Sequence, residues 1–527
     1  MFISENMYGD SCLREAASSN NMNNFLTNII RSKYSLLLLI VFITVFAVAH
    51  TQSPLYSSNQ NTYLLHGLAN ANLGFLSYDW MANTIDPFPL FSLIVSLTYS
   101  NAPELFFYIY YAIILGVFIF SIMGIVSKVW GINRSDLEYL TNFVVITCVG
   151  SAAIDLSKLM SGVAGQYILG PVFQPSVFGV FLLLSVYAFL AGKPFLSVIF
   201  LGVAANFHAT YLLSAASLTL SYMTIIILDE KNYRKALSVG LLSLISVAPV
   251  VIYTFLSFTP TSIESIKQAQ SILVDYRIPH HAKVDVWFGH ETLIKLSIVG
   301  FALFVLRRSR IWLIILIPFL ISITLTLIQV LTGSHFLALL FPWRISSFLI
   351  PLCSFLLAGG VVYYIFHKYI RIINKHRKEI RKLLFFVLVL SFISGIVIQI
   401  DKNESHSKAK FTPMMSFVTE TISKDNIYLI PPRLQRFRLQ TGARILVDEK
   451  THPYKDVEVI DWYSRLQLAN EFYSTGSKKQ CQVLYEISHR YGVTHVVSEE
   501  KKMLNCDLLN EIFNDGIYYV YKIKDIN

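Results

Sequence analysis

Long apolar runs constrain the fold of this chain most strongly. Residues 36–49, 105–126, 236–258 and 311–330 consist almost wholly of aliphatic and aromatic side chains. About 20 such residues in a helix cross a hydrocarbon core roughly 30 Å thick. Only 14% of the chain is charged, whereas soluble domains carry about 25% charged residues. The sequence therefore predicts an α-helical polytopic membrane protein.

About eleven transmembrane helices are expected. The predicted spans are residues 35–50, 103–127, 139–155, 167–192, 194–207, 209–228, 236–258, 292–306, 311–331, 345–366 and 383–400. They make up a membrane domain of residues 35–400, preceded by a polar segment of residues 1–34 and followed by a mixed, charged tail of residues 401–527.

The placement of basic residues predicts the orientation of these spans. The net charge is +10, and Lys and Arg gather at the ends of apolar runs, above all in residues 368–382. The predicted outer loop 51–102 has no Lys or Arg. By the positive-inside rule, the N-terminus is cytoplasmic and the tail exoplasmic. No basic stripe interleaved with aromatic residues is found, so no nucleic-acid partner is expected.

Two features near the chain ends allow two interpretations each. The stretch FAVAHTQS fits a signal-peptidase site after Ala49, but the long polar segment before it favours an uncleaved first span. Cys481 and Cys506 share the tail and either form a disulfide in an exoplasmic compartment or remain separate thiols.

The tail alternates between short strand patterns and helical periodicity. Strands are predicted at residues 426–430, 444–447, 494–498 and 517–523, with helices at 457–472 and 481–491. Such alternation is typical of a small parallel α/β layer. The basic residues at 433–455 would either bind an anionic acceptor or form internal ion pairs, and the second interpretation is favoured.

Two aspartates in the outer loop 51–102 are the leading catalytic candidates. Asp79 and Asp86 lie in SYDWMANTIDPFPLFS, far from any Lys or Arg in the sequence. An amphipathic stretch before them would place Asp79 at the membrane–water boundary, where a carboxylate is suited to act as a general base. The alternative is an Asp that forms a turn, which is favoured for Asp86 because Pro87 follows it.

This arrangement resembles the GT-C superfamily of membrane glycosyltransferases. The resemblance rests on a first outer loop with membrane-proximal acidic residues, many spans and an exoplasmic α/β tail. The loop is also similar to that of a group of bacterial membrane proteins, which implies a bacterial inner (plasma) membrane. It implies a polyprenyl-phosphate-linked sugar donor, inversion at the anomeric carbon, and a catalytic base at Asp79, with Asp86 second. The first outer loop departs from the family pattern because its two aspartates are seven residues apart, with no D-D, D-E or D-x-D pair in residues 51–102. No cofactor is therefore assigned, and a divalent metal is left open.

Polar residues near the predicted outer ends of spans are candidates for substrate binding. Each has an ordinary structural alternative, such as a histidine packed between helices or an arginine that reaches the lipid head groups. The candidates are Arg344, Gln174, His208, Asn206, His66 and His290, the last in the second large outer loop, 259–291. Arg344 would hold a donor phosphate.

The expected function is transfer of a sugar from a polyprenyl-phosphate donor to a glycan or lipid acceptor on the exoplasmic face. The expected partners are therefore the lipid bilayer, the lipid-linked donor and that acceptor. The alternatives are a transporter or flippase of lipid-linked saccharides and a polysaccharide polymerase.

Overall fold

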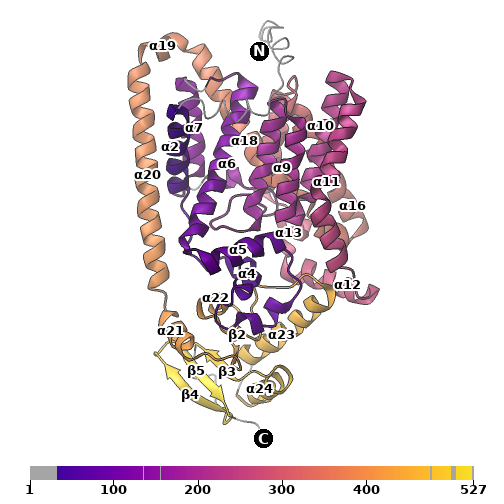
Figure 1. The fold of residues 1–527 in the computed structure, drawn as a ribbon, viewed down its shortest axis with the longest axis vertical. Helices are drawn as coiled ribbons and strands as arrows, with labels where there is room; N and C mark the ends of the chain where they lie inside the picture. The colour runs from indigo at the N-terminus through magenta and orange to yellow at the C-terminus, as the bar shows by residue number, and fades with distance from the viewer. Residues whose placement is uncertain (1–32, 134–135, 155, 475–476, 500–505, 525–527) are drawn as a thin grey trace.

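The computed structural model describes residues 33–133, 136–154, 156–474, 477–499 and 506–524. Most of residues 1–34 therefore lie outside the described residues. A helical bundle forms one end of the molecule, and a small α/β domain near the C-terminus forms the other (Figure 1). Helices and loops of the two large outer loops lie between them.

Each of the eleven predicted spans contains a helix of the bundle. These are α2 (Lys33–His50), α6 (Leu105–Trp130), α7 (Leu137–Gly150), α8 (Val180–Leu190), α9 (Pro194–Phe207), α10 (Leu212–Glu230), α11 (Tyr233–Ser257), α15 (His290–Val305), α16 (Ile311–Thr332), α18 (Ser346–Lys368) and α20 (Arg377–Ser407). By length and composition, six helices of the described chain can cross a membrane, in the regions of α6, α10, α11, α16, α18 and α20. A helical membrane protein is thus supported, while the count of eleven spans remains a prediction.

One predicted span begins much later than expected. Residues 167–174 form a loop, and the helical part starts at η7 (Pro175–Gly179), which leads into α8. The loop packs tightly: a Cβ on Gly170 would lie 2.5 Å from the Tyr167 ring, and Gly165, two residues before the loop, adopts a left-handed φ of +64°. Glycines in such positions disfavour a continuous helix, and the apolar composition alone concealed this.

Helix α20 lies at the edge of the bundle beside α2 and α7 (Figure 1). Only 17% of its most apolar window is buried, against 67% for α6. It joins the short α19 (Ile370–Lys375) at one end to α21 (Thr412–Thr421) at the other. Its exposed side chains, such as Phe385, Leu390 and Val397, are apolar and suit contact with lipid.

Short helices of the outer loops cover the end of the bundle nearest the α/β domain. The first outer loop holds α3 (Gln60–Tyr63), α4 (Leu65–Asn70), η4 (Leu76–Tyr78), η5 (Met81–Asn83) and α5 (Pro89–Asn101). The second holds α12 (Ile263–Ser271), the π-helix η9 (Ile272–Arg277), α13 (Pro279–Ala282) and α14 (Val284–Trp287). The remaining short elements are η6 (Ser157–Met160), η8 (Ala209–Tyr211), α17 (His335–Leu339) and η10 (Pro342–Ile345).

The α/β domain contains a five-stranded mixed sheet in the order β2-β1-β3-β5-β4. The strands are β1 (Ile427–Leu429), β2 (Arg444–Ile445), β3 (His495–Ser498), β4 (Leu509–Asn514) and β5 (Tyr519–Ile523), and the helices are α21, α22 (Phe437–Thr441), α23 (Asp456–Ser474) and α24 (Ser477–Tyr491). Strands β1, β2 and β3 are parallel as predicted, whereas β5 and β4 are antiparallel. The mostly exposed edge strand β4 was missed, because its sequence LNEIFN carries little apolar pattern.

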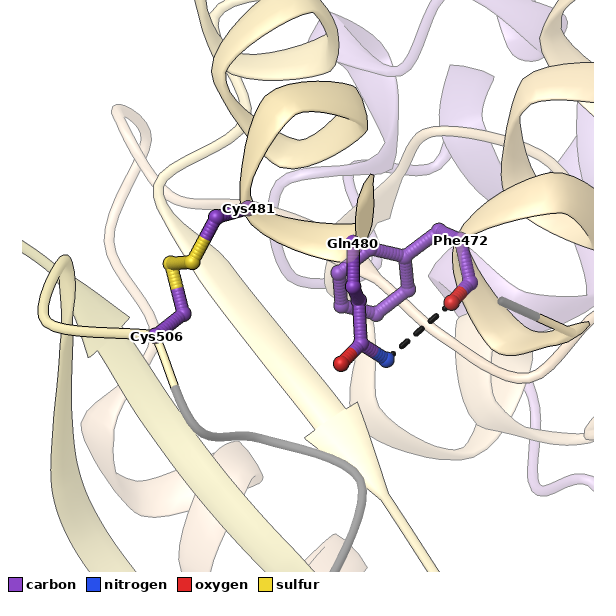
Figure 2. Close-up of a disulfide and its surroundings, with 4 residues drawn as sticks. All are labelled: Phe472, Gln480, Cys481 and Cys506. Atoms are coloured by element: carbon purple, nitrogen blue, oxygen red, sulfur yellow. Dashed lines mark hydrogen bonds between the residues drawn. A yellow bond between two sulfur atoms is a disulfide. The ribbon is translucent and has the colours of Figure 1, made fainter. Parts of the chain in front are cut away.

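Cys481 of α24 and Cys506 are joined in a disulfide with an S–S distance of 2.03 Å (Figure 2). Beside it, the Gln480 side-chain amide donates to the Phe472 carbonyl at 3.1 Å, which ties α24 to the end of α23. Of the two interpretations of these cysteines, the structure adopts the disulfide. Disulfides persist in oxidising compartments, which is consistent with an exoplasmic tail.

Candidate functional site

The structure places Asp79 in the contact between the first outer loop and the α/β domain. Its side chain is fully buried, and Oδ1 accepts the Met81 amide at 2.9 Å. Oδ2 accepts the Ile445 amide at 3.0 Å and lies 3.4 Å from Nε of Arg438. The expectation of a carboxylate without a positive partner is wrong, because folding brings in a distant arginine that the local sequence could not reveal.

Arg438 is shared between two acids. It is 1% exposed and bonds Asp448 Oδ2 through Nη1 at 2.8 Å. Close packing surrounds the group: the Phe75 amide donates to the Gly442 carbonyl at 2.8 Å, and a Cβ on Gly74 would lie 2.6 Å from that oxygen. Here the interpretation of tail arginines as internal ion pairs holds.

Asp86 lies in a different environment, just before α5. Its Oδ1 accepts the Phe88 amide at 2.8 Å, the turn that its position before Pro87 predicts. The same oxygen lies 3.9 Å from Nδ1 of His66, and the carboxylate is 20% exposed. Burial lowers the pKa of His66, against the opposing charge of Asp86. Asp86 therefore combines a structural turn with a partly accessible carboxylate beside a neutral imidazole.

Arg344 in η10 is 8% exposed, so it does not extend to the lipid head groups. Nη1 donates to Gln166 Oε1 at 2.6 Å and Nη2 to the Tyr211 hydroxyl at 3.1 Å. The guanidinium carbon lies 4.7 Å from the centre of the Tyr211 ring. Among the described residues, Nε has no hydrogen-bond partner and no carboxylate forms an ion pair with Arg344.

Gln174 and His208 both adjoin Tyr211. Gln174 donates to Ser176 Oγ at 2.8 Å, and the Ser176 carbonyl accepts the Tyr211 hydroxyl at 2.6 Å. His208 is held at Nδ1 by the Thr210 hydroxyl at 2.8 Å, with its ring 5.6 Å from that of Tyr211. The His208 ring also lies 4.9 Å from Phe88, which links this group to the loop that carries Asp86.

Two other predicted residues lie outside this group. Asn206 donates to the carbonyls of Gly202 and Ser246 and accepts the Val250 amide at 3.1 Å. It thereby bridges Ser246 and Val250 at the bend that Pro249 favours inside α11. His290 is exposed at the start of α15, where none of the described contacts links it to Arg344 or Asp86.

A second cationic group comes from the second outer loop and the α/β domain. Arg277 Nη2 donates to the Lys450 carbonyl at 2.6 Å, while its Nε has no described hydrogen-bond partner. His281 bonds the Ala164 carbonyl through Nδ1 at 2.6 Å. Burial lowers the pKa of His281 to about 4 and that of His452 to about 3, so both imidazoles are neutral at pH 7.

The two cationic groups belong to one cluster. Burial raises the pKa of Tyr63 to about 12, and the charges of both Arg344 and Arg277 act against this rise. Phe88 lies 5.1 Å from Tyr63 and 5.9 Å from Tyr454, ring centre to ring centre. We call this set the outer cluster: Arg344, Arg277, Lys450, His208, His281, His452, Tyr63, Tyr211, Tyr454 and Phe88.

A mostly apolar pocket of about 170 Å³ adjoins the outer cluster at Tyr454, between α12 and α17. Among the described residues, no three His, Cys, Asp or Glu side chains are arranged to hold a metal ion. The described groups at the site are cations, neutral imidazoles, aromatic rings and the partly exposed carboxylate of Asp86, and Asp456 lines the adjoining pocket.

Sequence reasoning did not single out Tyr63, Phe88, His452 or Tyr454. Two sequence features could have indicated these residues: Phe88 follows Asp86 closely, and the stretch THPY at 451–454 interrupts a charged region. Their convergence depends on contacts between segments far apart in the chain, which periodicity does not predict.

Comparisons with known proteins give limited information. A family model described as a domain of unknown function (DUF6798) matches residues 409–469. No curated protein matches the chain. A similar solved structure is the archaeal oligosaccharyltransferase AglB from Archaeoglobus fulgidus, in complex with an inhibitory peptide and a dolichol-phosphate. It has 10% sequence identity and a TM-score of 0.48 over 89% of this chain and 69% of that chain; a score below 0.5 does not show a shared fold.

Proposed function

We propose that the chain is a membrane glycosyltransferase that moves a sugar from a polyprenyl-phosphate-linked donor to a glycan or lipid acceptor on the exoplasmic face. The observation that carries this proposal is the buried guanidinium of Arg344, which has no acidic partner among the described residues. Burying an unpaired charge costs several kcal/mol. A bound phosphate offsets that cost, because guanidinium groups bind phosphate oxygens with two parallel hydrogen bonds.

The surroundings of Arg344 also favour a phosphate that arrives from the bilayer. Arg344 lies just before α18, a helix in one of the six segments that can cross a membrane. Tyr211, on which the guanidinium stacks, lies at the start of another such segment. A phosphate bound here would keep its polyprenyl chain beside apolar helices and its sugar toward the α/β domain.

In the proposed reaction, Asp86 accepts the proton of the acceptor hydroxyl. The hydroxyl oxygen attacks the anomeric carbon while the bond from that carbon to the phosphate oxygen breaks. The leaving phosphate keeps the bonding electron pair, and Arg344 stabilises the charge that develops on it. A single displacement of this kind inverts the anomeric centre, and a positioned base contributes about 10²- to 10⁴-fold to the rate.

Asp86 replaces Asp79 as the first candidate for the base. Asp86 is partly exposed and lies two residues from Phe88, which contacts His208. Asp79 is buried, and its oxygens are occupied by backbone amides and Arg438. We assign Asp79 the role of fastening the first outer loop to the α/β domain, so that Asp86 is held in place.

The test is release of polyprenyl phosphate from a panel of polyprenyl-phosphate sugars by the protein in lipid nanodiscs, with candidate acceptors added. Asp86→Asn should lose activity by about 10²- to 10⁴-fold and keep its fold. Asp285→Asn is the matched control, since Asp285 is exposed on α14. Release that is unchanged in Asp86→Asn would remove Asp86 as the base. Donor binding without release by the wild-type protein would favour a flippase of lipid-linked saccharides.

A further inference from the structure

Two arginines from different parts of the chain, the buried Arg344 and the partly buried Arg277, lack acidic partners among the described residues. None of the ion pairs among the described residues involves Arg344 or Arg277, and Nε of each has no hydrogen-bond partner there. Arg344 belongs to the helical bundle, whereas Arg277 comes from the second outer loop. Each guanidinium is therefore a separate candidate for binding an anion.

Short links connect the two arginines. Arg344 bonds Gln166, which lies two residues from Ala164, and the Ala164 carbonyl is bonded by His281 of the second outer loop. His281 is four residues from Arg277. On the other side, Tyr211, His208, Phe88 and Tyr454 form a continuous series of ring contacts, with centres 4.9–5.9 Å apart. The charges of both arginines also lower the pKa of His281, so both guanidinium groups lie near that ring. A ligand with two charged groups that lies along these contacts would meet both arginines.

The neighbouring acidic groups do not neutralise the positive charges of these two arginines. Asp79 and Asp448 share Arg438, so that trio carries one net negative charge. Asp448 also accepts the Lys450 amide at 2.9 Å, which places the net negative charge beside Lys450. His281 and His452 are neutral because burial lowers the pKa of each. Asp86, beside the neutral His66, adds one negative charge on the loop that carries Phe88. None of the described ion pairs involves Arg277 or Arg344, so each of these two positive charges lacks a carboxylate at ion-pair distance.

We infer that the donor is joined to its sugar through a diphosphate, with Arg344 on the phosphate next to the polyprenyl chain and Arg277 on the phosphate next to the sugar. This inference rests on the proposed transferase function. A sugar-linked monophosphate diester carries one negative charge, whereas the diphosphate diester carries two and matches the two arginines. Arg277 is assigned to the sugar side because it bonds the α/β domain at Lys450.

The assignment also gives the reaction a defined product. The bond between the anomeric carbon and the nearer phosphate oxygen breaks, and that oxygen keeps the electron pair. The acceptor oxygen gains the sugar and loses its proton to Asp86. Polyprenyl diphosphate leaves with one more negative charge than the donor diester had, next to Arg277, where an unpaired cation stabilises it most.

Binding measurements on the full-length protein in nanodiscs test the inference. The probes are polyprenyl phosphate and polyprenyl diphosphate of one chain length, with inorganic diphosphate as a third. The diphosphate lipid should bind at least about ten-fold more tightly than the monophosphate lipid, the contribution expected from one more hydrogen bond to a charged group. Arg277→Gln should remove that difference and leave monophosphate binding unchanged.

Two further variants keep the result interpretable. Arg277→Lys, which retains the charge, should restore most of the preference, and Lys267→Gln is the control because Lys267 is exposed on α12. Equal affinity for the two lipids, or equal weakening of both by Arg277→Gln, would overturn the diphosphate assignment and leave the proposed function standing. Binding of neither lipid would overturn both. Binding of inorganic diphosphate without either lipid would mean a soluble ligand instead.

Discussion

Asp79 has either a catalytic or a positioning role, and the Asp79→Asn variant distinguishes between the two. The substitution keeps the size of the side chain and an oxygen to accept the Met81 amide. It places an NH₂ group where Oδ2 now meets the Ile445 amide and Arg438. Two sets of donors then face each other in a fully buried site.

The expected cost follows from these contacts. A buried donor left without an acceptor costs about 1–3 kcal/mol, and removal of one member of a buried ion pair costs about 3–5 kcal/mol. Arg438 keeps Asp448 in the variant, so the lower end applies, and we expect about 3 kcal/mol of lost stability in the contact between the first outer loop and the α/β domain. Hydrogen–deuterium exchange of residues 437–448 measures it as faster local opening.

Asp461→Asn is the control for this experiment. Asp461 pairs with Arg465 on α23 and is 40% exposed, so its removal should cost about 0.2–1 kcal/mol. Faster exchange in Asp79→Asn, with a parallel loss of transferase activity, would support the positioning role. Loss of activity without faster hydrogen–deuterium exchange would refute the positioning role and make Asp79 the first candidate for the catalytic base again.

Four other outcomes are expected. Asp86→Asn should lower kcat by about 10²- to 10⁴-fold without faster exchange of residues 437–448, and a change in both would count against a purely catalytic role. Arg344→Gln should raise the KM for a polyprenyl-phosphate donor by about 10- to 100-fold, the loss of one or two hydrogen bonds to a charged group, and an unchanged KM would contradict phosphate binding. Cys481→Ser should destabilise the α/β domain by about 2–4 kcal/mol, measured by protease susceptibility, because the disulfide bridges a separation of 25 residues. The free energy of unfolding should decrease as the pH drops below about 6.5, down to about pH 4 for His281 and about pH 3 for His452, because the unfolded state then binds protons that the buried imidazoles do not. Each histidine lowers the free energy of unfolding by at most about 1.4 kcal/mol per pH unit. A thermal midpoint that stays constant from pH 7 to 5 would contradict this.

Sequence patterns predicted the local structure well where apolar periodicity is strong. The helices of the bundle and α23 and α24 of the tail follow directly from runs and repeats of apolar residues. The prediction was wrong at residues 167–174, where a loop replaces the first helical turns: Gly170 packs closely against Tyr167, and Gln166, just before the loop, binds Arg344. Hydropathy averages over such residues and therefore cannot detect them.

The candidate site was predicted only in part, for a related reason. Arg344, Gln174, His208 and Asp86 were found because each is polar in an apolar setting. Whether Asp79 has a positive neighbour depends on Arg438, which lies in the tail and reaches the first outer loop only in the folded protein. Arg277 and Lys450 likewise meet through a contact between two distant segments.

The outer end of α20 has a mechanical consequence. Lys402 of α20 donates to the Thr51 hydroxyl at 2.7 Å, and Gln399 accepts the Gln52 amide at 2.9 Å. The first outer loop and the segment that leads to the α/β domain are thus joined where they leave the bundle. The ion pair between Asp79 and Arg438 joins the loop to the domain a second time, farther from the bundle. With contacts at both ends, movement of the first outer loop relative to the α/β domain is restricted. We therefore expect any opening that admits an acceptor to move the α/β domain and Asp86 together.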